Sequence, residues 1–241
     1  MKMIFGLFLL ASVSTKADLA FDLLKASDRA RGGIGSGMQW ETTVISVENE
    51  QTSERDFVVK AKDNSAHVEA LKPAKYKGEV YIFNDRNMWF YKPTLKKPVS
   101  ISARQKLSGQ AANGDIASTN YARDYTATFD KKEIIDNKTV HVLLLKAKSK
   151  NLTYDKIKYW IEEKSKLAIK AEFQTLQGVP FKIGILKYGE KIKVGGEFVP
   201  FVSELTITDA KYPKNYSIIK YRQPQFKSIS DSTFNINNLT R

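Results

Sequence analysis

The residue types that usually perform chemistry are sparse in this sequence. It contains no cysteine, which excludes disulfides, thiolate nucleophiles and cysteine-ligated metal centres. Its two histidines, His67 and His141, lie in segments where apolar and polar residues alternate, and neither has a serine or carboxylate partner at a recognisable motif spacing. We therefore expect two strand histidines, and no catalytic residue, metal site or cofactor.

Glycine and carboxylate motifs are equally weak. The segment GGIGSG (32–37) follows an expected helix and precedes an expected strand, which reverses the order found in phosphate-binding loops. Asp115 and Asp124 fall in or beside an irregular region, where a pair of carboxylates could act in hydrolysis. Such a pair needs a defined separation in space, which a sequence does not provide.

Aromatic residues in expected strands are the more informative set. Segments 80–83 and 88–91 carry bulky apolar side chains at every position, so both faces of these strands must be covered. Helices could cover one face, and a second layer, a partner or an apolar ligand could cover the other. The aromatic strand residues are Trp40, Phe57, Tyr81, Phe83, Trp89, Phe90, Tyr91, Tyr159, Trp160 and Phe173.

The elements that must position these residues are mostly strands. DLAFDLLKASDRAR (18–31) predicts one amphipathic helix with Leu19, Leu23 and Ala26 on its apolar side. From Met38 onward the dominant period is two, in about eleven strands joined by turns too short for a crossover helix. We expect a mainly β fold, an antiparallel and largely meandering sheet that curls because of its size. No linker or composition break interrupts the pattern, which predicts a single domain at 18–241.

Residues 94–125 break the strand pattern. They contain two glycines and several small residues, with little alternation, and short helical turns fit SARQKL and NGDIASTN. An irregular region of about thirty residues inside a compact β domain is typical of a lid or binding loop. We expect this region and the N-terminal helix to cover the concave face of the curled sheet.

The N-terminus has the layout of a secretory signal peptide. A basic start (MK), an apolar run (MIFGLFLLASV) and STKA predict cleavage after Ala17, and the apolar run is too short to span a bilayer comfortably. In a chain without cysteine this favours the periplasm of a Gram-negative bacterium. Loss of Lys2 and Lys16 lowers the net charge from +13 to +11, a surplus that permits anionic cargo without demonstrating it.

Several segments resemble one known family. DRNMWFYKP (85–93) is similar to the Asp/Gly-x-x-x-Trp-x-Tyr-x-Pro hairpin of the LolA/LolB-like lipoprotein-carrier superfamily. RQKLSGQAANGDIASTNYARDYTATF (104–129) resembles the continuation in the subfamily of outer membrane lipoprotein-sorting proteins. Segments 22–33 and 152–173 also fit, so the resemblance covers essentially all of the chain after the signal peptide.

The resemblance implies a half-open (incomplete) antiparallel β-barrel that is closed by helices around an apolar cavity. In such carriers the acyl chains occupy the cavity beneath a helical lid. We predict that Trp89 and Tyr91 face this cavity and that Met88 and Phe90 face the other side. The cavity candidates are Trp40, Phe57, Trp89, Tyr91, Tyr159 and Phe173, and the lid candidates are Arg104 (as a latching arginine), Gly114, Asp115 and Asp124.

Three functions remain open from the sequence. The leading one is a periplasmic binding protein, not an enzyme, that carries acylated lipoproteins or lipids from an inner-membrane exporter to an outer-membrane receiver, without nucleic acid or stable membrane insertion. The second is an adaptor subunit of an envelope lipid-export complex that binds no cargo of its own. The third is a lipid hydrolase that uses Asp115 or Asp124.

Overall fold

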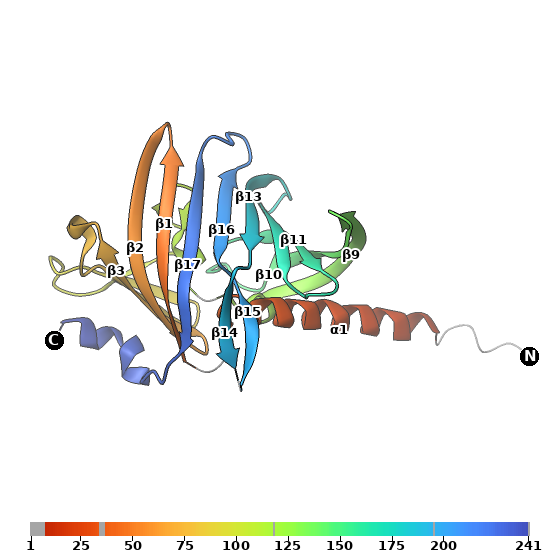
Figure 1. Cartoon of the computed structure of the whole chain (residues 1–241), viewed down its shortest axis with the longest axis horizontal. Coiled ribbons are helices and arrows are strands. Elements are labelled where there is room, and N and C mark those ends of the chain that lie inside the picture. Colours follow the sequence, from red (N-terminus) through yellow and green to blue (C-terminus); the bar gives the residue numbers. More distant parts are fainter. Residues whose placement is uncertain (1–7, 34–36, 118, 195, 241) are drawn as a thin grey trace, which may run out of the picture.

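One large antiparallel sheet organises the protein (Figure 1). The computed structural model describes residues 8–33, 37–117, 119–194 and 196–240, with side chains from Lys16 onward. Thirteen strands form the sheet, in the order β6 (Val99–Ile101), β5 (Asn87–Tyr91), β4 (Val80–Asn84), β3 (Ser65–Lys72), β2 (Gln51–Lys62), β1 (Met38–Glu48), β17 (Tyr216–Phe226), β16 (Glu204–Asp209), β13 (Pro180–Lys187), β12 (Ala168–Gln174), β11 (Lys156–Glu162), β10 (Lys138–Ala147) and β9 (Tyr125–Ile135).

The sheet curls without closing, as the sequence predicted. Its edge strands β6 and β9 do not pair with each other within the described residues. Two small sheets accompany it, β7 (Lys106–Ser108) with β8 (Ala111–Ala112) and β14 (Glu190–Val194) with β15 (Glu197–Phe201). The predicted count of about eleven strands was too low, because the insertion adds short strands and because segment 198–210 divides into β15 and β16.

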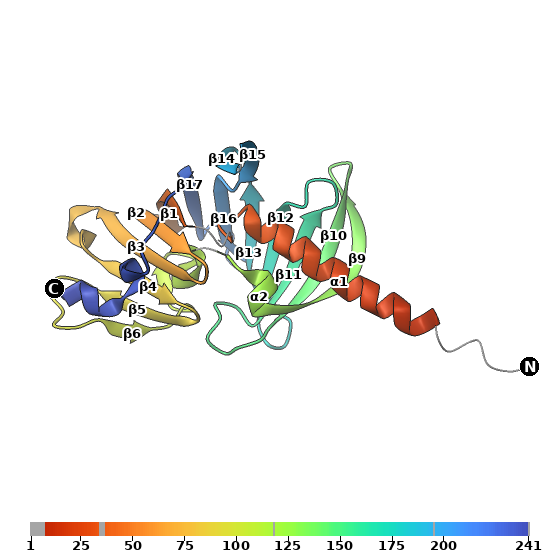
Figure 2. The same ribbon diagram turned by 90° about the horizontal axis from the view of Figure 1, so that it is seen from below.

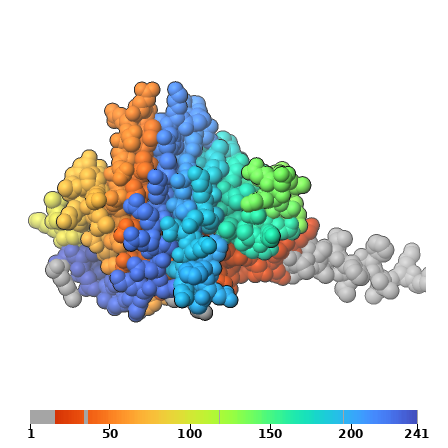
Figure 3. Space-filling model, in the orientation of Figure 1, coloured from red at the N-terminus to blue at the C-terminus, as the bar shows by residue number. Residues whose placement is uncertain are grey.

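Strand β17 lies in the middle of the sheet, although it is the last strand in the chain. It pairs with β1 on one side and with β16 on the other. The space-filling view shows these early and late segments side by side on the outer surface (Figure 3). The order is therefore not a pure meander. The predicted tight turns are present: Asp136 and Asn137 both have positive φ, as a two-residue type I′ hairpin requires.

Helix α1 (Phe8–Arg29) packs against β9 and against the short helix α2 (Tyr121–Asp124). Its buried stripe contains Ala20, Leu23 and Leu24, whereas the predicted stripe residue Leu19 is 39% exposed. The N-terminal part of α1 projects beyond the sheet (Figure 2). Of the predicted signal peptide, residues 1–7 lie outside the described residues, as do residues 34–36 of the glycine-rich segment.

The outer face of the sheet is covered near the C-terminus. The 3₁₀ segment η3 (Asp231–Phe234), which is followed by η4 (Ile236–Thr240), packs on β3 and β4. Phe234 is 5% exposed and Ile82 of β4 is fully buried. This cover explains why β4 and β5 are apolar on both faces: one face lies against the interior and the other against the end of the chain.

Candidate functional site

The concave side of the sheet carries a continuous apolar core. Four of the predicted cavity residues, Trp40, Phe57, Tyr159 and Phe173, belong to it, and each is at most 2% exposed. The period-two pattern of β1, β2, β11 and β12 places them on this face. Each of the four rings packs against another aromatic ring of the interior; those of Tyr154 and Phe173 stack at 3.9 Å between centroids.

Strand β5 has the opposite orientation to the predicted one. Met88 is 2% exposed and lies in the interior core, and Phe90 packs against the same core. Trp89 instead borders a hollow on the outer face together with Phe234. Because residues alternate along a strand, Tyr91 lies on the side of Trp89. The prediction that Trp89 and Tyr91 face the interior was wrong, since nothing in the motif revealed the C-terminal cover.

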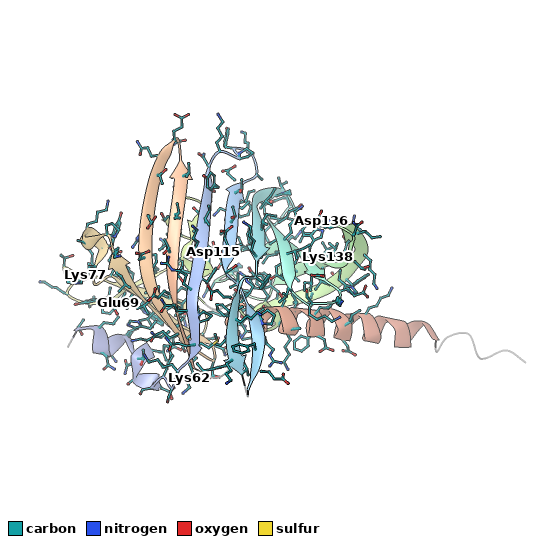
Figure 4. The ribbon with its side chains drawn as sticks, in the orientation of Figure 1. Lys62, Glu69, Lys77, Asp115, Asp136 and Lys138 are labelled. Atoms are coloured by element: carbon teal, nitrogen blue, oxygen red, sulfur yellow. The ribbon has the colours of Figure 1, made fainter. Side chains whose placement is uncertain are left out.

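The insertion (residues 94–125, of which Ser118 lies outside the described residues) covers the core from the open side. It contains β6, β7, β8, the 3₁₀ segment η2 (Asn113–Asp115) and α2. Figure 4 shows Asp115 of this segment deep in the molecule, behind β17. The sequence prediction that short helices cover the concave face is confirmed for η2 and α2, whereas SARQKL (102–107) forms a turn and the start of β7. Four of the seven buried apolar side chains of the insertion are alanines: the set is Leu107, Ala111, Ala112, Ile116, Ala117, Ala122 and Tyr125.

Hydroxyl groups fasten the first part of the insertion to the central strands. The Ser108 hydroxyl lies 2.9 Å from that of Ser46 on β1, and the Ser46 hydroxyl lies 3.0 Å from that of Ser217 on β17. The backbone N–H of Gln110 donates to the Ser217 hydroxyl at 2.8 Å. All four residues are buried, so these bonds satisfy groups that water does not reach.

Two basic side chains of the sheet donate to backbone carbonyls of the insertion. Arg55 donates to the Leu107 carbonyl at 3.4 Å, and Lys182 donates to the Gln110 carbonyl at 2.6 Å. Arg55 also forms a close ion pair with Glu79, at 2.7 Å. Burial lowers the pKa of the Lys182 ammonium group.

The end of helix α1 fastens the last part of the insertion. The Asp28 carboxylate accepts a hydrogen bond from the backbone N–H of Ala122 at 2.8 Å, and the Arg31 carbonyl accepts one from Thr119 at 3.3 Å. Asp28 is 2% exposed, and burial raises its pKa to about 7. The helix and the insertion therefore act as one cover over the core.

The lid candidates Gly114 and Asp115 lie in the tightest part of this cover. The Asp115 carboxylate accepts hydrogen bonds from the backbone N–H of Ala112 and the Tyr154 hydroxyl, both at 2.8 Å. Burial raises its pKa. A side chain at Gly114 would overlap the Thr153 hydroxyl, so this position requires glycine.

The other two lid candidates lie nearer the surface. Arg104 pairs with Asp155 at 2.6 Å, and both side chains are partly exposed. Asp124 pairs with Arg123 at 2.7 Å and with Arg86 at 3.4 Å. Asp115 and Asp124 each have their own structural partners. These contacts therefore do not favour a catalytic role in hydrolysis for either carboxylate.

A pocket of about 100 Å³ opens where the cover meets the sheet. Ligand sites for small molecules usually have about 300–1,000 Å³. The apolar cavity implied by the family resemblance is therefore filled by side chains of the core and the insertion in this conformation. The pocket is bordered by three lid candidates and by interior groups, among them Gly114, Asp115, Asp124, Arg31, Met88 and Tyr121.

Sequence reasoning missed the basic groups of the interior. Arg31 is 7% exposed, donates to the Tyr159 hydroxyl at 3.1 Å and lies over the Tyr121 ring at 5.3 Å. In the sequence it is the last residue of the expected helix 18–31, where a basic side chain is common for reasons that do not involve a binding site. Arg55 could have been found, because it alternates in phase with Phe57 and Val59 along β2.

The described part of the chain offers neither a metal site nor a membrane-spanning helix. No cluster of three or more His, Asp or Glu side chains there could hold a metal ion. No described helix combines the length and apolar character that crossing a membrane requires. His67 and His141 lie in strands β3 and β10, as expected, and burial lowers the pKa of both imidazoles.

An open, curled antiparallel sheet with a helical cover over an apolar concave face defines the class of LolA-like folds, and the comparisons agree. A LolA superfamily protein from Nitrosomonas europaea superposes with a TM-score of 0.81 and 25% sequence identity, over 91% of this chain and 98% of that one. An outer membrane lipoprotein-sorting protein domain from Vibrio parahaemolyticus gives 0.77 and 18%, over 93% and 100%. A DUF1329 family protein from Desulfovibrio piger gives 0.77 and 17%, over 93% and 99%.

The family assignment follows. The model of a family described as "Uncharacterized protein" matches residues 62–241, well over half of the chain, so the chain belongs to that family. With the structural matches, this confirms the predicted membership of the LolA/LolB-like superfamily. No curated protein shows significant sequence similarity to this chain.

Proposed function

We propose that this protein is a periplasmic carrier that holds the acyl chains of lipoproteins or lipids against the concave face of its sheet and delivers them toward the outer membrane. It binds cargo and is not an enzyme. Its partners are a donor at the inner membrane and a receiver at the outer membrane. Similarity to a LolA superfamily protein and to an outer membrane lipoprotein-sorting domain supports this proposal.

The observation that carries the proposal is that the part of the insertion after β6 forms no strand pairing with the large sheet. Strand β6 is the edge of that sheet, whereas β7 and β8 pair only with each other and are held on the central strands by hydroxyl contacts. Movement of the insertion exposes the apolar side of the sheet without breaking any pairing between the central strands. This is the motion that a carrier with a filled interior needs in order to take up cargo.

The energetics favour exchange of the insertion for an acyl chain. Each methylene transferred from water to an apolar environment contributes about 0.8 kcal/mol. The buried apolar side chains of the insertion are four alanines together with Leu107, Ile116 and Tyr125. A long acyl chain is apolar along its whole length, so its burial can offset the loss of these contacts.

The N-terminal segment fits a cleaved signal peptide. Side chains from Lys16 to Leu19 are exposed, and burial of α1 begins at Ala20. We propose that residues 1–17 are removed on export and that residues 18–241 form the carrier domain. The part of α1 that packs on the insertion is retained in this mature chain.

A second function remains supported by one observation. The interior is filled, with a pocket of only about 100 Å³, which suits an adaptor subunit that binds no cargo. Native mass spectrometry and lipid extraction of protein purified from its host membrane fraction distinguish the two functions. The carrier retains stoichiometric lipid or acylated protein. Lipid-free protein that binds no acyl chain, yet co-purifies with a membrane protein, contradicts the carrier and supports the adaptor.

A further inference from the structure

The guanidinium group of Arg31 is a basic group buried inside a cover that we propose to move. It is 7% exposed, borders the pocket and donates to the Tyr159 hydroxyl at 3.1 Å. The phenol groups of Tyr121, Tyr188 and Tyr221 also surround it. Its neighbours are therefore mainly neutral hydroxyl groups and aromatic rings.

Nearby carboxyl groups are engaged elsewhere. None of the ion pairs in the described part of the chain includes Arg31. Asp28 accepts from the backbone of Ala122, and Asp115 accepts from the backbone of Ala112 and from Tyr154. Burial raises the pKa of both carboxyl groups, which reduces the negative charge they offer.

Lys182 of β13 is a second basic group near Asp115, and it is half-buried. Its ammonium group donates to the Gln110 carbonyl at 2.6 Å, so its closest partner is the insertion itself. Arg55 provides the contrast, because it keeps an ion pair with Glu79 that does not involve the insertion. Movement of the insertion therefore removes a partner from Lys182 and opens the space beside Arg31, while Arg55 remains paired.

We propose that the cargo is an anionic amphiphile, whose phosphate or carboxylate group binds Arg31, with Lys182 as a second contact, when its acyl chain replaces the insertion. The inference rests on the proposed carrier function and specifies its cargo class. A charge left buried without a counter-charge is strongly unfavourable, and a guanidinium binds phosphate or carboxylate oxygens in a bidentate manner. A zwitterionic or neutral head group carries no net charge to offset these two cations.

Two probes with the same acyl chain test the inference. Palmitoyl lysophosphatidylglycerol carries a net negative charge, and palmitoyl lysophosphatidylcholine carries none. Binding is measured by isothermal titration calorimetry below the critical micelle concentration, on delipidated mature protein. We expect wild-type protein to bind the anionic probe at least about tenfold more tightly than the neutral one. A factor of this size is typical of one hydrogen bond to a charged group. Palmitate and hexadecyl phosphate then show which acid group binds better.

Variants locate the preference. Arg31→Gln should abolish the preference and leave the affinity for lysophosphatidylcholine within about twofold, whereas Arg31→Lys should keep part of it. Lys187→Gln removes one positive charge from the exposed pair with Glu204, outside the insertion, and should keep the full preference. Lys182→Gln serves as a second variant if Arg31→Gln does not fold, and it should reduce the preference.

The outcomes separate this inference from the function on which it rests. Equal affinity of wild-type protein for both probes overturns the anionic cargo and leaves the carrier function intact. An anionic preference that survives in both Arg31→Gln and Lys182→Gln also overturns it. Failure of both probes and both acids to bind contradicts the carrier function itself.

Discussion

The hydroxyl groups of Ser46 on β1 and Ser108 in the insertion lie 2.9 Å apart in the buried interior. This contact joins the sheet to the segment that we propose to move. Since the chain contains no cysteine, a disulfide can be introduced at this contact without competing thiols.

A disulfide between positions 46 and 108 should lock the cover. We expect oxidised S46C/S108C to lose uptake of a fluorescent fatty acid and to regain it on reduction, because the insertion can then leave the sheet. The control is S46C/S217C, which joins Ser46 to a hydroxyl at 3.0 Å on the neighbouring strand and does not tether the insertion. Uptake by the oxidised S46C/S108C variant at the wild-type rate would show that the insertion does not gate the interior.

Gly114 should tolerate no side chain. In Gly114→Ala the new methyl group overlaps the Thr153 hydroxyl, so we expect a loss of about 1–3 kcal/mol in the free energy of unfolding in urea. The double variant G114A/T153A removes that hydroxyl and should recover part of the loss. Equal stability of G114A and the wild type would contradict the close packing of the cover.

The pKa of Asp28 makes stability depend on pH. Burial raises it from 3.8 to about 7, so the folded protein holds a proton that the unfolded chain releases between these values. The contribution of Asp28 is therefore present at low pH and is lost as the pH rises to about 7. The amide side chain of the Asp28→Asn variant cannot ionise, and it keeps an oxygen that can accept from the backbone N–H of Ala122.

Urea unfolding of wild type and Asp28→Asn from pH 4.5 to 8.5 tests this dependence. The stability of the variant relative to the wild type should increase as the pH rises toward 7 and then stay constant. The groups that face Asp28 are Arg31, Asp124 and the backbone of residues 121 and 122. A difference that does not change with pH would mean that Asp28 keeps an ordinary pKa in the folded protein.

Arg55 and Arg104 should differ strongly in their effect on stability. The Arg55–Glu79 pair has side chains only 8% and 15% exposed, so Arg55→Met leaves a largely buried carboxylate without its counter-charge and should cost about 3 kcal/mol. The Arg104–Asp155 pair is 34% and 26% exposed, and Arg104→Gln should change stability by less than about 1 kcal/mol. Thermal unfolding of both variants provides the comparison, and equal losses would contradict it.

Phe234→Ala should destabilise the protein without affecting cargo. Phe234 packs on the outer face of β4 and is 5% exposed. Replacing a buried phenylalanine by alanine lowers the free energy of unfolding by about 3–5 kcal/mol. The emission of Trp89, which borders the same hollow, should shift to longer wavelength. A changed cargo affinity in the folded variant would place the binding site on the outer face.

The open sheet, the N-terminal helix and the covering insertion could be predicted from the sequence, because period-two alternation and short turns are local signals. The inward direction of Trp40, Phe57, Tyr159 and Phe173 in the structure follows from the same alternation. The orientation of β5 could not be predicted, because both of its faces are apolar and the covering residue, Phe234, is more than 140 positions away in the chain.

The interior basic groups escaped prediction for a related reason. Arg31 is buried by tyrosines from the insertion, from β11, from the segment after β13 and from β17, which only tertiary structure brings together. The sequence around Arg31 resembles an ordinary basic helix end. The burial of Arg31 therefore depends on long-range packing, which a local sequence pattern does not predict.

The central place of β17 constrains the order of folding. Until this strand is available, β1 and β16 each present an unpaired edge, and strands β1–β6 form a separate sheet from strands β9–β13 and β16. Unpaired edges are templates for aggregation, and pairing of segments this far apart in sequence is slow. The two half-sheets therefore keep exposed edges until the end of the chain has been synthesised, and pairing of β17 with β1 and β16 joins them.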